Sequence, residues 1–447
     1  MTNCGLGIAD CGLNVIPRAM LMPVVALAAA LVVPPTPAAA QTVAVEGGRV
    51  YTMTGAPIEN GTVLIRDGVV VAVGANVAVP AGATRIDARG KIVTPGFFES
   101  DTHLGLVEVG AVGTTRDYAT QHEPTGDTDD VVQAAFNVAD GLNPNSIVLP
   151  VTRVAGVTTA VSRPDGGLIA GQGVVIDLAG ASADALLVRS PVAMFAALGE
   201  DGQRAGGGAR AGATLRLREV LEDARAYARR RADFERGETR AFAASRLDLE
   251  ALQPVLQGRL PLVVEAHRAS DIRAALRIAA EYDLRLVILG GTEAWMLAGE
   301  LARARVPVIV KVLQNLPESF ERLGARYDNA ALLRQAGVQV ALTTSDTHNA
   351  RNLPQEAGNA VAYGLPYDEA LRAVTLYPAQ IWGVAERYGS LAPGKVANLV
   401  VWSGDPLELL TTVEQVLIRG RPVPLVSRDT ELRDRYRNPA DARRAYP

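Results

Sequence analysis

The chain is poor in the residue types that build covalent and metal-dependent sites. Its 447 residues include two cysteines, four histidines and 5% aromatic residues. Both cysteines, Cys4 and Cys11, precede an apolar run at residues 19–33. A chain cleaved after this run therefore has no disulfide, and no thiolate that would act as a nucleophile or bind zinc. Metal-binding or proton-transfer chemistry must then come from a few histidines and from carboxylates.

The chain also lacks a strong excess of charge of either sign. Its formal net charge is −4 and its isoelectric point is near 5.8. Nucleic-acid-binding proteins usually carry a basic surface, so this balance argues against nucleic acid as a partner. The sequence leaves open whether the protein is a monomer or a homo-oligomer.

The first forty residues have the parts of a secretory signal. Arg18 precedes the apolar run at residues 19–33, and Ala38-Ala39-Ala40 places small residues before Gln41. A positive residue, an apolar core shorter than a comfortable membrane span and a small-residue cleavage point predict a signal peptide at residues 1–40 and a periplasmic protein. An uncleaved anchor helix is the alternative. No second segment predicts a membrane span, so no stable membrane insertion is expected after cleavage.

Sections of different hydrophobic pattern follow the predicted signal. Residues 41–92 hold short runs of β-branched residues separated by turns, one of them at Asp67-Gly68. Strand-like and helix-like runs alternate over residues 93–385, which predicts an α/β fold with a (β/α)8 TIM-like barrel. Residues 386–425 return to β character, and residues 426–447 form a C-terminal tail.

Two motifs stand at the ends of the predicted barrel. It begins with Pro95-Gly96-Phe97-Phe98-Glu99-Ser100-Asp101-Thr102-His103, and it is followed by Gly389-Ser390-Leu391-Ala392-Pro393-Gly394-Lys395-Val396-Ala397-Asn398-Leu399-Val400-Val401. Both resemble signatures of the amidohydrolase superfamily, in particular its imidazolonepropionase-like branch of secreted bacterial proteins. The resemblance implies a small β-sandwich, formed jointly by residues 41–92 and 386–425, beside the barrel. In the family, a histidine is usual at the position of Asp101 and an aspartate at that of Asn398.

The resemblance also implies a set of metal ligands. His103 matches the second histidine of the first-strand motif. Residues two apart on a strand face the same side, so Asp101 and His103 can reach one ion. His267 follows an apolar run at residues 261–266 and matches the family's fifth-strand histidine. Asp346 matches the eighth-strand aspartate, which binds metal and takes a proton from the attacking water.

Two imidazoles and two carboxylates suit Zn²⁺, with Mn²⁺ or Fe²⁺ as alternatives. Each ligand also has a structural interpretation: a hydrogen-bonded core histidine for His103 or His267, and a cap of the following turn for Asp346. One ion is expected and not two, because two further ligand positions are altered. Gly290 and Gly291 stand near the sixth-strand histidine position, and Phe195 stands where the bridging lysine is usual, with Glu200 or Glu265 as substitutes.

The predicted function is hydrolysis of a carbon–nitrogen bond in a small amide, cyclic amide or dipeptide-like substrate by metal-activated water. Arg153 and Arg351 are candidates to pair with a substrate carboxylate and His348 to contact the substrate, although all three also fit surface or loop roles. His122 is interpreted as a loop residue. The competing prediction is a degenerate amidohydrolase that keeps the barrel without metal or turnover and acts as a ligand-binding or structural protein.

The signal interpretation predicts where the mature chain begins. After expression in a bacterial host with a periplasm, N-terminal sequencing of the soluble protein should find a start near Gln41, because signal peptidase cleaves after small residues such as those at 38–40. Soluble protein that begins at Met1 or Met20 would contradict this prediction.

Overall fold

Two eight-stranded sheets organise the part of the chain that the structure describes. The computed structural model describes residues 41–119, 131–314 and 316–437, which belong to one structural unit. The first sheet contains β1 (Thr42–Val50), β2 (Ile58–Arg66), β3 (Val69–Gly74), β4 (Thr84–Asp87), β5 (Ile92–Pro95), β14 (Leu399–Trp402), β15 (Val413–Ile418) and β16 (Arg421–Val423). The second contains β6 (Phe97–Thr102), β7 (Val157–Ser162), β8 (Ile169–Asp177), β9 (Leu187–Ala197), β10 (Leu262–Ala266), β11 (Leu286–Gly290), β12 (Val308–Val310) and β13 (Val340–Leu342). The predicted signal peptide, both cysteines and His122 lie outside the described residues.

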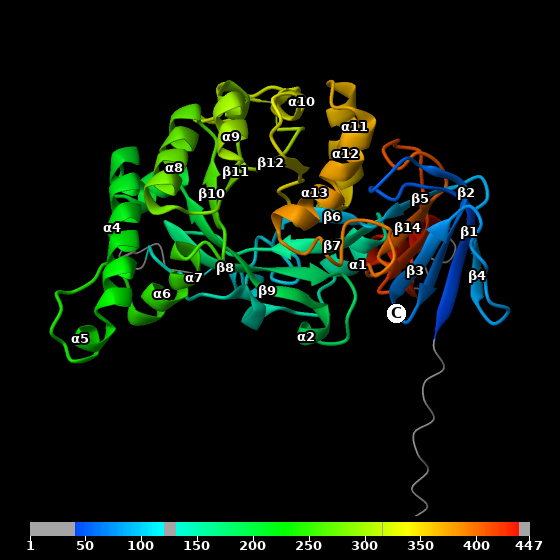
Figure 1. The fold of residues 1–447 in the computed structure, drawn as a ribbon, viewed down its shortest axis with the longest axis horizontal. Coiled ribbons are helices and arrows are strands. Elements are labelled where there is room, and N and C mark those ends of the chain that lie inside the picture. The colour runs from blue at the N-terminus through cyan, green and yellow to red at the C-terminus, as the bar shows by residue number, and fades with distance from the viewer. Residues whose placement is uncertain (1–40, 120–130, 315, 438–447) are drawn as a thin grey trace, which may run out of the picture. The chain divides into compact units, whose positions relative to one another are not determined.

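The first sheet joins segments from both ends of the chain. β14 runs antiparallel to β5, with Leu399 beside Pro95, so strands coloured blue and red in Figure 1 share one sheet. The hairpin between β2 and β3 turns at Asp67-Gly68, where both residues have positive φ angles, 50° and 81°. Such angles let a two-residue turn follow the twist of the strands. The two β sections of the sequence therefore meet in one hydrogen-bonded sheet.

The second sheet is a nearly closed barrel whose strands follow in chain order from β6 to β13. Neighbouring strands run parallel, except that β8 is antiparallel to both β7 and β9. The connection at residues 163–168 is too short for a parallel crossover, which takes about a dozen residues or more. The barrel thus agrees with the predicted TIM-like fold, whereas the expected uniform alternation of parallel strands and helices does not hold at β8.

A buried carboxyl group bridges the two end strands of the barrel sheet. Glu99 of β6 accepts hydrogen bonds from the Ser100 and Thr344 backbone N–H groups, at 2.9 and 3.1 Å, and from the hydroxyls of Thr343 and Thr344. Both threonines follow β13, and in the described part of the chain β6 and β13 are not paired as strands. Burial raises the pKa of Glu99 to about 8, although these hydrogen bonds offset part of the effect.

Helices connect the barrel strands and surround the sheet on its outer side (Figure 1). The short 3₁₀ helices are η1 (Gly113–Thr115), η2 (Val138–Gly141), η3 (Ala294–Leu297) and η4 (Ala350–Asn352). The α-helices are α1 (Val148–Arg153), α2 (Ala183–Leu186), α3 (Gly199–Ala205), α4 (Arg210–Arg229), α5 (Arg231–Glu235), α6 (Arg246–Ala251), α7 (Gln253–Leu256), α8 (Ala269–Tyr282), α9 (Ala298–Ala304), α10 (Asn329–Gln335), α11 (Leu353–Ala362), α12 (Tyr367–Ala373), α13 (Leu376–Ile381) and α14 (Arg428–Arg437). Within the described ranges, no helix is both long and apolar enough to cross a membrane.

The α8 helix illustrates how these segments pack against the barrel. Ile272, Ala275 and Ile278 recur at a spacing of three residues and are buried in the large apolar cluster outside the strands. The helix ends at Asp283, which adopts the left-handed conformation that stops a helix. Its position agrees with the amphipathic pattern of the sequence.

Side chains of the barrel strands alternate between two apolar regions. Val263 of β10 belongs to an inner cluster with residues of other barrel strands, whereas its neighbours Leu262 and Val264 belong to the outer cluster with the helices. This alternation follows from the period of two along a strand. Trp382, which is 1% exposed, joins the inner cluster. Apolar side chains therefore fill the interior of the barrel, which leaves the ends of the strands as the place for a site.

Asn398, which departs from the family pattern, ties the first sheet to the barrel. Its Nδ2 donates to Asp177 Oδ1 at 2.7 Å, and its Oδ1 accepts from the Arg419 backbone N–H at 2.8 Å. Asp177 is fully buried at the end of β8 and also accepts from Arg419 Nε at 2.7 Å and the Tyr388 hydroxyl at 3.0 Å. The amide donates to this carboxylate and accepts from the backbone at the same time, whereas an ionised aspartate could only accept, so asparagine suits the position.

We therefore expect Asn398→Asp to destabilise the protein, although it restores the residue that is usual in the family. It would place a second carboxylate against Asp177 and remove a donor, at a cost of about 3 kcal/mol in the free energy of unfolding. Urea unfolding would measure the change, with Asn145→Asp at an exposed position as the control. Equal stability of the two variants would contradict this account.

Candidate functional site

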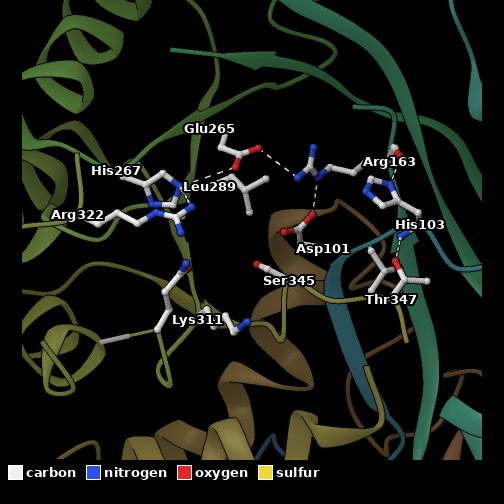
Figure 2. A pocket seen from close by; sticks show the side chains of 13 residues that line it. Asp101, His103, Arg163, Glu265, His267, Leu289, Lys311, Arg322, Ser345 and Thr347 are labelled. Carbon is white, nitrogen blue, oxygen red and sulfur yellow. Dashed lines mark hydrogen bonds and ion pairs between the residues drawn. The ribbon is translucent and has the colours of Figure 1, made fainter. Parts of the chain in front are cut away.

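A polar pocket lies at the carboxyl ends of the barrel strands, with a cavity volume of about 180 Å³ (Figure 2). TIM-like barrels build their sites at this end. Its lining residues belong to or follow strands β6, β7, β10, β11, β12 and β13: Asp101, Thr102, His103, Arg163, Glu265, His267, Leu289, Gly290, Lys311, Gln314, Arg322, Ser345 and Thr347. The structure thus brings Asp101, His103 and His267 together from distant parts of the sequence.

The Arg163 guanidinium lies between two carboxylates of this pocket. Its Nε donates to Asp101 Oδ1 at 2.5 Å, and its Nη2 donates to Glu265 Oε2 at 3.1 Å (Figure 2). Its Nη1 donates to the Pro164 carbonyl at 3.2 Å. Arg163 directly follows β7 and is 9% exposed. Every nitrogen of the guanidinium therefore has an acceptor, and the group links β6, β7 and β10.

Electrostatic attraction keeps Arg163 and Glu265 ionised. Burial alone would lower the pKa of Arg163, but the charges of Asp101 and Glu265 raise it above its ordinary value. Burial alone would raise the pKa of Glu265, but the charge of Arg163 and the contact with His267 bring it down to about 2. Arg163 and Glu265 therefore form a charged pair at neutral pH.

His267 has both ring nitrogens engaged. Its Nδ1 lies 2.7 Å from the Thr292 hydroxyl, and its Nε2 lies 3.0 Å from Arg322 Nη2. A guanidinium can only donate, so Nε2 accepts and Nδ1 carries the hydrogen. His267 is 4% exposed, and its Nε2 is 3.7 Å from Glu265 Oε1. The lone pair that a metal would need is therefore shared with an arginine.

His103 differs from His267 in the partners of its ring. Its Nδ1 lies 2.8 Å from the Arg163 carbonyl oxygen, and its ring stacks on Tyr118 with 3.9 Å between ring centroids. A carbonyl oxygen only accepts, so Nδ1 carries the hydrogen. Burial, and next the charge of Arg163, lower the pKa of His103, which favours the neutral ring. Nε2 then carries the lone pair of the neutral ring, and His103 lines the cavity.

Two further cations, Lys311 and Arg322, line the pocket. Lys311 directly follows β12, and its charge acts on Asp346 and Glu356, which do not line the cavity. Arg322 Nε is buried and has no hydrogen-bond partner. Arg322 Nη1 lies 3.5 Å from Glu318, whose side chain is 58% exposed. The two side chains therefore add positive charge around the cavity, which favours an anionic ligand.

Gly290 explains the missing sixth-strand histidine. Its φ angle is +87°, and a Cβ there would lie 2.4 Å from Cε1 of His267. A side chain at this position is therefore excluded by both backbone conformation and space. The His267 ring occupies the room that a second histidine would need.

Asp346 does not line the pocket, although it follows β13. Its Oδ1 accepts from the backbone N–H groups of His348 and Asn349, at 3.0 and 3.2 Å, and its Oδ2 accepts from Asn349 Nδ2 at 2.9 Å. Its neighbours Ser345 and Thr347 line the cavity instead. The structure thus gives Asp346 the alternative role considered from the sequence, a cap of the following turn.

The three expected substrate contacts lie away from this pocket. Arg153 donates to the Leu178 carbonyl at 3.2 Å, and Arg351 pairs with Asp429 at 2.6 Å. His348 is exposed, and its Nε2 lies 3.0 Å from the Glu108 carbonyl. None of the three is among the residues that line the cavity, so the structure does not place them at a shared site. Phe195 borders a smaller adjoining cavity and stacks on Trp382.

These side chains do not fit a divalent metal. Asp101 and Glu265 are paired with Arg163, and the His267 lone pair is taken by Arg322. Within the described ranges, no group of three or more His, Cys, Asp or Glu residues is arranged to hold an ion. Cations at the pocket would also repel one. The structure therefore does not assemble the Zn²⁺, Mn²⁺ or Fe²⁺ site expected from Asp101, His103, His267 and Asp346.

Sequence reasoning did not select the cations that dominate the pocket. Arg163 and Lys311 each stand immediately after a strand, the position that places a side chain at the site end of a barrel. That signal was present in the sequence. Arg322 lies in a segment without such a signal, and only the tertiary structure brings it to His267.

Comparison with known proteins agrees with the fold. A family model described as "Amidohydrolase family" matches residues 221–423. The crystal structure of an amidohydrolase from Thermotoga maritima MSB8 is similar with a TM-score of 0.77 and 30% sequence identity, over 86% of this chain and 99% of that chain.

Two curated proteins show more partial similarity. Amidohydrolase tasK from Hapsidospora irregularis is 25% identical over 372 residues, which cover 76% of this chain and 37% of the relative. An imidazolonepropionase from Chromobacterium violaceum is 38% identical over 96 residues, which cover 20% of this chain and 23% of the relative. The matched part of this chain thus spans well under half the length of either protein.

Proposed function

This chain belongs to the amidohydrolase family, and on that premise we propose that it hydrolyses a carbon–nitrogen bond in a small amide that carries an anionic group. The observation that carries the proposal is the pocket at the barrel's carboxyl end, which Lys311 and Arg322 line with positive charge in addition to the paired Arg163. The family supports the reaction class, and the pocket supports the substrate class. A short match supports placing the chain near the imidazolonepropionase-like branch.

Charge in the cavity favours an anion. Three lining residues, Arg163, Lys311 and Arg322, are cationic, whereas two, Asp101 and Glu265, are carboxylates. Arg163 already neutralises part of both carboxylates. A substrate carboxylate held by Lys311 and Arg322 would complete the balance with charge-assisted hydrogen bonds. The cavity is smaller than the roughly 300 Å³ typical of drug-sized ligands, which favours a compact amide such as an N-acyl amino acid, a dipeptide or a cyclic amide.

His103 is the group best suited to activate water. Its Nδ1–H is anchored by the Arg163 carbonyl, so Nε2 can accept a proton from water and later deliver it to the leaving nitrogen. Lys311 and Arg322 provide positive charge for the oxyanion or the substrate carboxylate. Water attacks the amide carbon, the carbon–nitrogen bond breaks, and the products are an acid and an amine.

The ion pairs of Asp101 and Glu265 with Arg163 also favour a second candidate function, that of a non-catalytic protein which binds an anionic ligand. In that case the barrel is degenerate and the pocket binds without turnover. Measured binding of N-acyl amino acids without hydrolysis would distinguish this function from the first.

The cellular setting is part of the proposal. The apolar run at residues 19–33 leads us to propose the periplasm as its location and a small molecule as its partner, without nucleic acid and without stable membrane insertion. A homo-oligomer remains compatible with this setting.

The anion-binding role predicts a selective effect on affinity. For the best substrate in a screen of N-acyl amino acids, dipeptides and cyclic ureides, Lys311→Met and Arg322→Met should each raise KM about tenfold to a hundredfold, because a charge-assisted hydrogen bond is lost. The uncharged amide of the same substrate should show little change. Arg273→Met, which removes a surface ion pair with Glu300, is the matched control. Equal effects on charged and uncharged substrates would refute the assignment.

The proton-transfer role predicts an effect on turnover. His103→Asn keeps a donor for the Arg163 carbonyl but has no counterpart of Nε2. We expect kcat to fall about a hundredfold to ten-thousandfold with a smaller change in KM, as steady-state kinetics would measure. A variant that keeps the parent kcat would show that another group activates the water.

A further inference from the structure

The pocket pairs its potential metal ligands with arginine side chains. Arg163 binds the carboxylates of Asp101 and Glu265, and Arg322 shares the lone pair of His267 Nε2. These ligands come from the ends of β6 and β10, on opposite sides of the cavity in Figure 2. The two guanidinium groups thus contact the very oxygen and nitrogen atoms that a metal would need.

We propose that Arg163 and Arg322 replace the metal ion of this site, so that a metal position has become a fixed guanidinium site that binds no divalent cation. The inference concerns the same pocket as the proposed function. Its readout is metal binding, so an absence of hydrolysis would leave it standing.

The geometry of Arg163 supports the replacement. Its Nε and Nη2 hold oxygens of two carboxylates at 2.5 and 3.1 Å. A divalent ion between the same carboxylates would bind their oxygens at about 2.0–2.2 Å. The guanidinium therefore performs the electrostatic task of an ion, neutralising two carboxylates at the strand ends, with a slightly wider spacing.

Displacing the Arg163 side chain to admit an ion would cost free energy. It is 9% exposed, and its displacement would leave Asp101 and Glu265 without their cation. Removing one partner from a buried ion pair is strongly destabilising, because the remaining charges stay buried. The arginine and a metal ion thus compete for one place, and the covalently attached cation is always present.

Arg322 excludes the ion from the other side. A metal ligand must offer a free lone pair, but His267 Nε2 accepts a hydrogen from Arg322, and Nδ1 carries its own hydrogen toward Thr292. Gly290 provides no side chain that could take the place of His267. An ion would therefore need two arginines to leave the pocket.

The first test measures the parent protein directly. Elemental analysis after purification and calorimetric titration with Zn²⁺ should show no ion bound at the pocket, and a chelator should leave the melting temperature unchanged. Stoichiometric Zn²⁺ binding that disappears in Asp101→Asn or His267→Gln would overturn the proposal, whatever the behaviour of other variants.

The second test removes the arginine side chains from the proposed metal position. Arg163→Ala leaves two carboxylates unpaired, and the double variant Arg163→Ala/Arg322→Ala also frees His267 Nε2. We expect the double variant to bind about one Zn²⁺ per chain and its melting temperature to rise on Zn²⁺ addition, with affinity at least about tenfold above that of the parent. Arg163→Lys, which keeps a cation between the carboxylates, is the matched control and should not gain Zn²⁺.

The outcomes separate the explanations. A gain of Zn²⁺ by the double variant, but not by Arg163→Lys, supports replacement of the ion by arginine. A folded double variant, verified by circular dichroism, that binds no more Zn²⁺ than the parent contradicts it. If the double variant folds only when Zn²⁺ is added, that rescue supports the proposal, and if it does not fold under either condition, the titration of the parent decides.

Discussion

The contact between one buried guanidinium and two carboxylates sets the character of the whole pocket. Arg163 pairs with Asp101 and Glu265, and it lowers the pKa of Glu265 to about 2. These residues lie at or just after the carboxyl ends of strands β6, β7 and β10. Burying such charges is tolerable only when they are paired and hydrogen-bonded. The ends of β6, β7 and β10 are therefore coupled through Arg163, and the carboxylates that would serve a metal serve the arginine instead.

Buried carboxyl groups elsewhere follow the same rule with different partners. Asp177 receives the Arg419 guanidinium, the Asn398 amide and the Tyr388 hydroxyl, and it connects the barrel with the first sheet. Glu99 accepts hydrogen bonds from Ser100 of β6 and from Thr344, which follows β13. In each case the donors determine which residue the position can accept. Asn398 is an example, because the aspartate that is usual in the family could not donate to Asp177.

Family membership and site chemistry are distinct kinds of information in this protein. The fold places a pocket at the carboxyl ends of the strands, as the shared barrel requires, but the side chains in that pocket decide what it can bind. The pocket is cationic because Lys311, Arg163 and Arg322 line it. The ring of His267 occupies the space that a side chain at Gly290 would need. In the proposed function, the reaction in this pocket depends on imidazole and fixed cations, and the substrate is selected by its charge.

The sequence by itself determined the class of fold, the β character of both ends, and the delivery of Asp101, His103 and His267 to one end of the barrel. These features follow from local periodicity and from the rule that side chains at strand ends meet at one face. The antiparallel β8 was not predicted, because strand direction depends on the length of a connection more than on hydrophobic pattern.

Only the tertiary structure decided how the candidate residues are used. Whether Asp101 is a metal ligand or a partner of Arg163 depends on a side chain 62 residues away in the chain. Asp346 turned toward its own loop, and Arg322 reached His267 from 55 residues away. Such pairings are set by the three-dimensional arrangement of charges, which a linear pattern of residue types does not contain.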